Sequence, residues 1–164
     1  MLQQATFAER FAYGRPLDAA DDDMIRTVSR PTVALVARIL IGTIFLISGF
    51  AKLTDTEQTA AYMTQMGIPA AHTLALVAGC AEVLGALSII FGVLTRIGAI
   101  GLTLFMIPTT LLFHAFWNFT GMEQRTQMVD FVKNLAIIGG LSMLVAFGPG
   151  RYSIDAKLRW PKQS

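Results

Sequence analysis

Four long apolar segments alternate with short polar ones along this chain. They lie at about residues 32–53, 72–92, 97–117 and 130–147. At a rise of about 1.5 Å per residue, a helix of roughly twenty residues crosses the hydrocarbon core of a bilayer. Because lipid offers no hydrogen bonds to the backbone, each segment is predicted to be a helix. The pattern therefore predicts an all-α integral membrane protein, with a four-helix bundle over residues 32–150.

A shorter amphipathic segment separates the first two apolar segments. Thr54 or Asp55 can cap a helix there, and Gly67 followed by Pro69 would end it. Its apolar face is modest, as in helices that lie flat at a membrane surface. We therefore expect a short interfacial helix between the first and second spans.

The polar ends of the chain set the predicted orientation. Residues 1–31 form a polar N-terminal tail without the apolar stretch of a signal peptide, and residues 151–164 form a basic C-terminal tail. Lys and Arg gather in these tails and in the connection between the second and third spans: Arg10, Arg15, Arg26, Arg30, Arg96, Arg151, Lys157, Arg159 and Lys162. The other side would carry Lys52, Arg125 and Lys133. Because positive residues favour the cytoplasmic side, both termini are predicted to be cytoplasmic.

The composition excludes several classes of protein. Only 15% of the residues are charged and 54% are hydrophobic, whereas about a quarter of a soluble domain is charged. A net charge of +2 does not suggest a nucleic-acid partner. One cysteine, Cys80, and two histidines are too few for an evident metal, haem or iron–sulfur site. No metal is expected, and no cofactor is evident from the composition.

A single carboxylate, Glu82, interrupts the second apolar segment near its middle. Small residues flank it at helical spacings of three and four: Ala78, Gly79, Gly85 and Ala86. Small residues let neighbouring helices approach closely, and an ionisable group at this depth normally faces protein and has a partner. Glu82 is therefore predicted to lie inside the bundle.

The first apolar segment carries two cations on one helical face. Arg38, Gly42, Phe45, Gly49 and Lys52 repeat by four and three, which predicts that this face is turned inward. The alternative is that both cations lie near helix ends and extend to opposite membrane surfaces.

An up-down arrangement of the spans brings four polar residues to one depth on the extracytoplasmic side. These are Lys52, His114, Lys133 and Asn134. Glu82 would lie below them and Arg38 lower still, toward the cytoplasm. The sequence therefore predicts a polar pocket that opens outward, with a carboxylate at its floor.

Two interpretations of this pocket are open. In the first, His114 with Lys52 or Asn134 binds a quinone headgroup, and Glu82 supplies a proton. In the second, Glu82 and Arg38 form a buried structural ion pair, while His114 and Asn134 fix the packing of the helices through hydrogen bonds. None of these spacings is a catalytic signature.

Several short motifs, taken together, resemble one family. They are Arg38 with Gly42, Phe45, Ser48-Gly49 and Lys52; Met66-Gly67-Ile68-Pro69; Ala81-Glu82 with Gly85; Phe91-Gly92 with Thr95-Arg96; His114; Lys133-Asn134-Leu135-Ala136 with Gly139-Gly140; and Gly148-Pro149-Gly150 with Ser153-Ile154-Asp155. This pattern, over about residues 34–155, is similar to that of the DoxX-like (DoxX/DoxD) four-helix membrane proteins.

The resemblance implies a place in a bacterial inner membrane and a role in redox chemistry. The family includes the membrane subunit of a thiosulfate:quinone oxidoreductase and has no agreed catalytic residues to transfer. We therefore expect an inner-membrane subunit of a quinone-linked redox complex, which does not catalyse a reaction alone. The alternatives are a non-catalytic accessory or assembly subunit and, ranked last, a small proton-coupled transporter that uses Glu82. The expected partners are the bilayer and other membrane subunits or a second copy of the chain.

Overall fold

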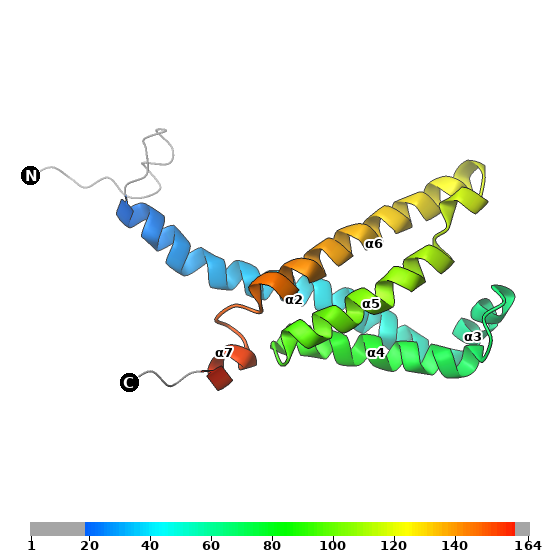
Figure 1. Cartoon of the computed structure of the whole chain (residues 1–164), viewed down its shortest axis with the longest axis horizontal. Coiled ribbons are helices and arrows are strands. Elements are labelled where there is room, and N and C mark those ends of the chain that lie inside the picture. Colours follow the sequence, from blue (N-terminus) through cyan, green and yellow to red (C-terminus); the bar gives the residue numbers. More distant parts are fainter. Residues whose placement is uncertain (1–18, 160–164) are drawn as a thin grey trace, which may run out of the picture.

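The computed structural model describes the backbone of residues 19–159 and the side chains of residues 30–158. It is helical throughout, and no strand occurs within the described range (Figure 1). The helices are α2 (Ala19–Thr54), α3 (Thr56–Gln65), α4 (Ala71–Phe91), α5 (Thr95–Phe113), the 3₁₀ helix η1 (Phe116–Asn118), α6 (Gly121–Phe147) and α7 (Ile154–Arg159).

Among the described residues, four helical segments are long and apolar enough to cross a membrane. They are Arg30–Thr54, Ala71–Phe91, Thr95–Asn118 and Gly121–Phe147. The predicted all-α membrane fold is thus confirmed, with the short helix α3 between the first two spans. The predicted orientation of the termini stays a prediction.

The helix of the fourth span, α6, begins earlier than the sequence pattern suggests. It starts at Gly121, whereas the apolar segment begins at residue 130. The intervening residues belong to the polar segment between the third and fourth apolar segments. They include Glu, Gln, Arg and Met, which all favour helix, and no proline, so the helix extends through them.

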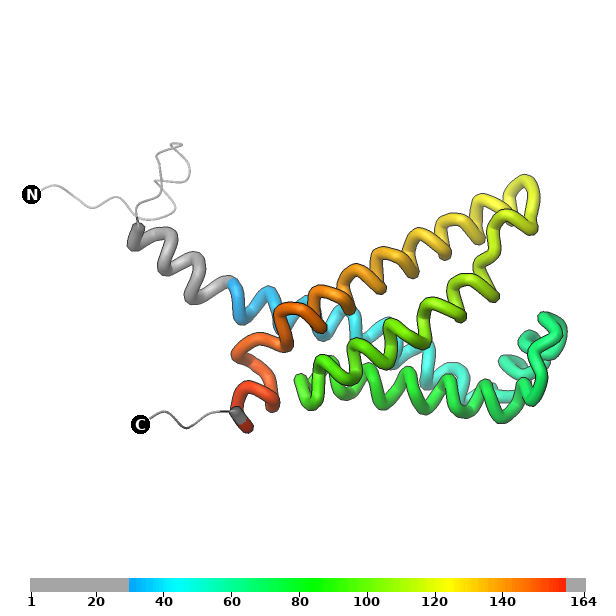
Figure 2. The backbone as a smooth tube through the Cα atoms, viewed as in Figure 1, coloured from blue at the N-terminus to red at the C-terminus, as the bar shows by residue number. Residues whose placement is uncertain are grey.

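The spans form two helix pairs rather than an evenly closed bundle. α2 packs most extensively against α4, and α5 packs against α6. α4 and α5 join the two pairs, and α6 touches α2 near Ile41, whose side chain lies against Gly140. Figure 2 shows this arrangement, with the α5–α6 hairpin lying across the α2–α4 pair.

Glycines allow the close approach of α2 and α4. A Cβ atom on Gly49 would lie 2.8 Å from the carbonyl oxygen of Gly79 and 2.9 Å from Cβ of Glu82. Arg38, Gly42 and Phe45 are buried on the same face of α2. The inward face predicted for the first span is therefore confirmed, and it packs on α4.

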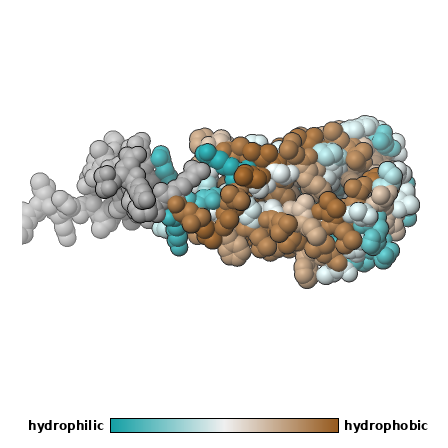
Figure 3. Space-filling view, turned by 60° about the horizontal axis from the view of Figure 1, so that its bottom comes forward, coloured by the Kyte–Doolittle hydropathy of each residue, from teal (hydrophilic) through white to brown (hydrophobic). Residues whose placement is uncertain are grey.

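Apolar side chains cover the outside of the spans. Leu84, Ile97 and Leu104 are each more than 60% exposed. Figure 3 shows this apolar surface over the middle of the molecule, with polar residues gathered toward the ends. Such a surface suits contact with lipid chains.

The described part of the C-terminal segment is folded against the bundle rather than extended as a tail. After the Gly148-Pro149-Gly150 turn, the backbone N–H of Asp155 donates to the carbonyl of Gly92 at 2.8 Å, and α7 follows. Residues 160–164 lie outside the described range.

The N-terminal tail predicted over residues 1–31 stays a prediction. α2 begins at Ala19, so the last part of that range is helical, and the stretch that could cross a membrane begins at Arg30. Residues 1–18, which include most of the predicted tail, lie outside the described range.

The glycine contact between α2 and α4 generates a stability prediction. Gly49→Ala should destabilise the protein by about 1–3 kcal/mol, because the new methyl group meets the carbonyl oxygen of Gly79 and Cβ of Glu82, which move only if α4 shifts. Unfolding of the purified protein in mixed micelles, followed by circular dichroism, measures this.

Gly101→Ala is the matched control. Gly101 is also inside a helix, but nothing lies within 4 Å of its Cβ position. This variant should be as stable as the parent or slightly more so. Equal stability of the two variants would contradict the close approach of α2 and α4.

Candidate functional site

A buried ion pair joins α2 to α4. Lys52 Nζ lies 3.0 Å from Glu82 Oε2 and also donates to Ser48 Oγ at 2.7 Å. The Glu82 side chain is 5% exposed and the Lys52 side chain 25% exposed. Glu82 therefore pairs with Lys52, not with Arg38 as the structural interpretation of the sequence expected.

The glycine contact between the two helices positions this pair. Gly49 precedes Lys52 by three residues and Gly79 precedes Glu82 by three, so each glycine lies one turn from a charged residue on the same face. Because the backbones approach closely at Gly49 and Gly79, the two side chains can meet directly.

A cavity of about 490 Å³ adjoins Lys52. It lies between α3, α4 and α5, beside the end of α2. Most of its lining is apolar, and the polar residues in the lining are Lys52, Thr59, Tyr62, Thr109 and His114. A pocket that combines an apolar wall with a few polar groups is the usual form of a small-molecule site.

His114 follows the last residue of α5 and is half-buried. Its Nδ1 lies 2.9 Å from Oε1 of Gln127, in the early part of α6. Beside it, the ring of Phe113 stacks on Tyr62 of α3, with ring centroids 5.7 Å apart. α3 therefore forms one wall of the cavity.

Thr59, Thr109 and Gln127 were not among the predicted site residues. Thr59 lies on the short amphipathic helix, whose inner face could have suggested it. Gln127 lies in the polar segment before the fourth apolar segment, so the apolar pattern gives no signal for its approach to His114.

Asn134 and Lys133 do not line the cavity. Asn134 is buried between α5 and α6, where its Nδ2 donates to Thr110 Oγ1 at 3.1 Å. Lys133 pairs with Asp130 at 2.6 Å on an exposed face. Adjacent residues of a helix point in different directions, so both could not face one pocket.

Arg38 lies in a second polar cluster at the other end of the bundle. It is 1% exposed and donates to the carbonyl oxygen of Tyr152. Its Nε and Nη1 have no hydrogen-bond partner among the described residues, and Nη1 packs against Gly92.

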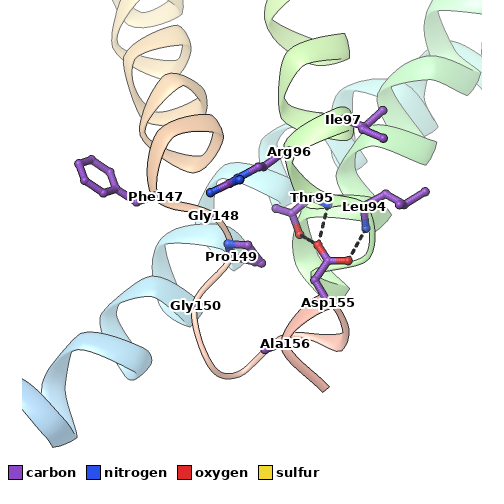
Figure 4. Close-up of a pocket in the computed structure, with 10 residues that line it drawn as sticks. All are labelled: Leu94, Thr95, Arg96, Ile97, Phe147, Gly148, Pro149, Gly150, Asp155 and Ala156. Carbon is purple, nitrogen blue, oxygen red and sulfur yellow. Dashed lines mark hydrogen bonds between the residues drawn. The ribbon is translucent and has the colours of Figure 1, made fainter. Parts of the chain in front are cut away.

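Asp155 caps α5. Its carboxylate accepts from the backbone N–H groups of Leu94 at 2.8 Å and Thr95 at 2.9 Å, and from the Thr95 hydroxyl at 2.9 Å (Figure 4). A carboxylate at a helix N-terminus satisfies backbone donors that lack a partner within the helix. This end of the bundle is thus held by the folded C-terminal segment.

Comparison with known proteins agrees with the motifs in the sequence. The sequence profile of the DoxX family matches residues 33–115, which is half of the chain. The chain belongs to the DoxX family. The resemblance inferred from its motifs is thereby confirmed.

Three relatives show how far the similarity of this DoxX protein extends. It is 34% identical over 129 residues to inner membrane protein YphA of Escherichia coli, covering 79% of this chain and 92% of the relative. It is 42% identical over 124 residues to inner membrane protein YqjF of Escherichia coli, covering 76% of this chain and 90% of the relative. It is 31% identical over 134 residues to the uncharacterized membrane protein Rv3486 of Mycobacterium tuberculosis, covering 78% of this chain and 82% of the relative. No solved structure gives a significant match.

The ion pair generates a double-mutant prediction. Lys52→Met or Glu82→Met alone should each destabilise the protein by about 3 kcal/mol, because each leaves one buried charge without its partner. The double variant should recover most of that loss, because two apolar side chains replace both charges. Unfolding in mixed micelles measures the coupling.

Lys133→Met is the control, since it breaks an exposed pair. It should change stability by less than about 1 kcal/mol. Additive losses in the Lys52 and Glu82 variants would contradict a direct pair.

Proposed function

We propose that this DoxX protein is an inner-membrane subunit of a quinone-linked redox complex, and that the cavity between α3, α4 and α5 takes the quinone headgroup. The observation that carries the proposal is a largely apolar cavity with Lys52 and His114 in its wall, next to the buried Lys52–Glu82 pair. The two Escherichia coli relatives, which are named as inner membrane proteins, support the location.

The shape and lining of the cavity fit this ligand class. A quinone has a flat ring with two carbonyl acceptors and an apolar tail. The cavity volume of about 490 Å³ lies within the usual range of small-molecule sites, roughly 300–1,000 Å³. The apolar lining includes Phe105 and Leu112, which suit the ring and the start of the tail.

Lys52 supplies a donor to this ligand. An ammonium group has three N–H donors, and the observed partners, Glu82 and Ser48, account for two of them. The third is available to a carbonyl oxygen in the cavity. Lys52 would thus connect the ligand to Glu82, and a proton could pass between Glu82 and the cavity through its ammonium group.

His114 suits the reduced form of the ligand. When Nδ1–H donates to Gln127 Oε1, the neutral ring presents Nε2 as an acceptor. A quinol hydroxyl could donate to that nitrogen. In this proposal the partner subunit exchanges the electrons, and both termini lie in the cytoplasm, so that the cavity faces the extracytoplasmic side.

A non-catalytic accessory subunit is the second candidate. It is favoured by the observation that Glu82, His114 and Asn134 each already have a protein partner, as residues with a purely structural role would. Purification in mild detergent tests it. A stoichiometric partner protein would support it, whereas a lone monomer or homo-oligomer would contradict it.

Quinone content tests the first candidate. His114→Ala should lower the quinone that copurifies from native membranes about five- to ten-fold, the effect of losing one hydrogen bond of about 1–1.5 kcal/mol. Ala78→Phe, which places a ring in the cavity, should remove the quinone almost completely. Liquid chromatography with mass spectrometry measures quinone per mole of protein.

Ala136→Phe is the matched control, because Ala136 is exposed on α6 and lines none of the described cavities. It should retain the parent quinone content. Unchanged quinone in both His114→Ala and Ala78→Phe would refute binding in this cavity.

A further inference from the structure

A second hollow region lies on the other side of α5, along its contact with α6. Ile100, Thr103 and Leu104 of α5 and Ser142, Val145 and Ala146 of α6 line a groove of about 290 Å³. Ile100, Thr103 and Leu104 come four, seven and eight residues after Arg96. At these helical spacings Arg96 lies on the same face of α5 as they do. The groove therefore has an apolar body and a cation at one end.

Arg96 sits at the end of this groove with most of its hydrogen-bonding capacity free. Its side chain is exposed, and its one described hydrogen bond is a long one, from Nη2 to the carbonyl oxygen of Ala146 at 3.4 Å. The guanidinium lies over Gly148, with Nη2 3.6 Å from the Cβ position of that glycine. A guanidinium has five donors in a planar fork, so four are available to a ligand.

Another hollow, of about 270 Å³, adjoins Arg96 at this end of the bundle. Its lining is mostly apolar, and the polar side chains in it are those of Thr95, Arg96 and Asp155. Figure 4 shows the Arg96 side chain directed toward Gly148. Arg96 thus stands between this hollow and the groove that runs along the membrane-spanning part of the helices.

The local charge is positive. Arg151 and Lys157 are exposed nearby in the chain segment that forms this end of the bundle. The one acid among residues 94–98 and 146–158 is Asp155, whose carboxylate is engaged with Leu94 and Thr95. An anion that approaches Arg96 therefore meets an excess of cations.

We propose that this seam between α5 and α6 binds an anionic phospholipid, with its phosphate on Arg96 and one acyl chain in the groove. Basic pockets between spanning helices at the membrane boundary are suited to such headgroups. The apolar groove rises about 12 Å above Arg96, from residue 96 to residue 104. That surface can be used by a lipid but not by free phosphate.

The competing explanation is that Arg96 only interacts with the C-terminal end of α6. Cations near the last carbonyls of a helix are stabilising without any ligand. The bond to Ala146 is of that kind. It explains neither the free donors of Arg96 nor the groove above it, so a measurement of lipid binding distinguishes the two.

The test uses the full chain reconstituted in phosphatidylcholine vesicles with a trace of spin-labelled phosphatidylglycerol, the nitroxide being on the acyl chain. Electron paramagnetic resonance gives the fraction of label immobilised by the protein, with spin-labelled phosphatidylcholine as reference. The parent should prefer phosphatidylglycerol. Arg96→Gln should lower that preference about five-fold, the contribution of one basic side chain near a membrane surface.

Two further variants make the outcome decisive. Arg151→Gln removes the same charge from an exposed residue that lines neither the hollow nor the groove, and it should lower the preference much less than Arg96→Gln does. Ser142→Phe fills the groove without changing charge and should reduce the immobilised phosphatidylglycerol several-fold, which tests the proposal even if Arg96→Gln does not fold.

Three results would overturn the proposal. One is the absence of any preference for phosphatidylglycerol in the parent. Another is an equal loss in Arg96→Gln and Arg151→Gln, which would show a diffuse surface charge instead of a site. The third is full displacement of the lipid by inorganic phosphate, which would show a site for the free anion.

Discussion

The direct pairing of Lys52 and Glu82 inside an apolar bundle is the interaction on which the rest of this structure depends. A charge at this depth is costly unless it has a partner, and an ammonium and a carboxylate meet only if their helices come unusually close. Gly49 and Gly79 provide that approach one turn away. The helix pair α2–α4 is therefore specified by its glycines and its charges together. The cavity lies beside Lys52, at the end of α2, where α3, α4 and α5 form its walls.

The polar residues of the chain separate into two groups along α2. Arg38 and Lys52 lie on one face but about 21 Å apart along the helix axis. Lys52 belongs to the end with α3, His114 and the cavity, whereas Arg38 is enclosed by the folded C-terminal segment at Tyr152. The first group borders a space that a ligand can enter. The second is closed by protein around Arg38.

Much of this could be predicted from the sequence, because hydrophobic length and helical spacing are local properties. The four spans, the short α3 and the inward face of α2 follow from them. The partner of Glu82 could not be predicted, since the choice between Arg38 and Lys52 depends on how far α2 and α4 are shifted along each other. The direction of Asn134 depends likewise on which helix α6 contacts. The folding of the C-terminal segment depends on contacts between residues far apart in the sequence, of Arg38 with the Tyr152 carbonyl and of Asp155 with the start of α5.

The most direct measurement of the central claim is the internuclear coupling between Lys52 Nζ and the Glu82 carboxyl carbon in bilayers. Solid-state NMR on protein with ¹⁵N-lysine and ¹³C-glutamate measures it, and the Lys52→Met variant assigns the signal. The structure, with 3.0 Å between Nζ and Oε2, predicts a strong coupling that disappears in that variant. A Glu82 carboxyl signal without coupling to any lysine would contradict the account.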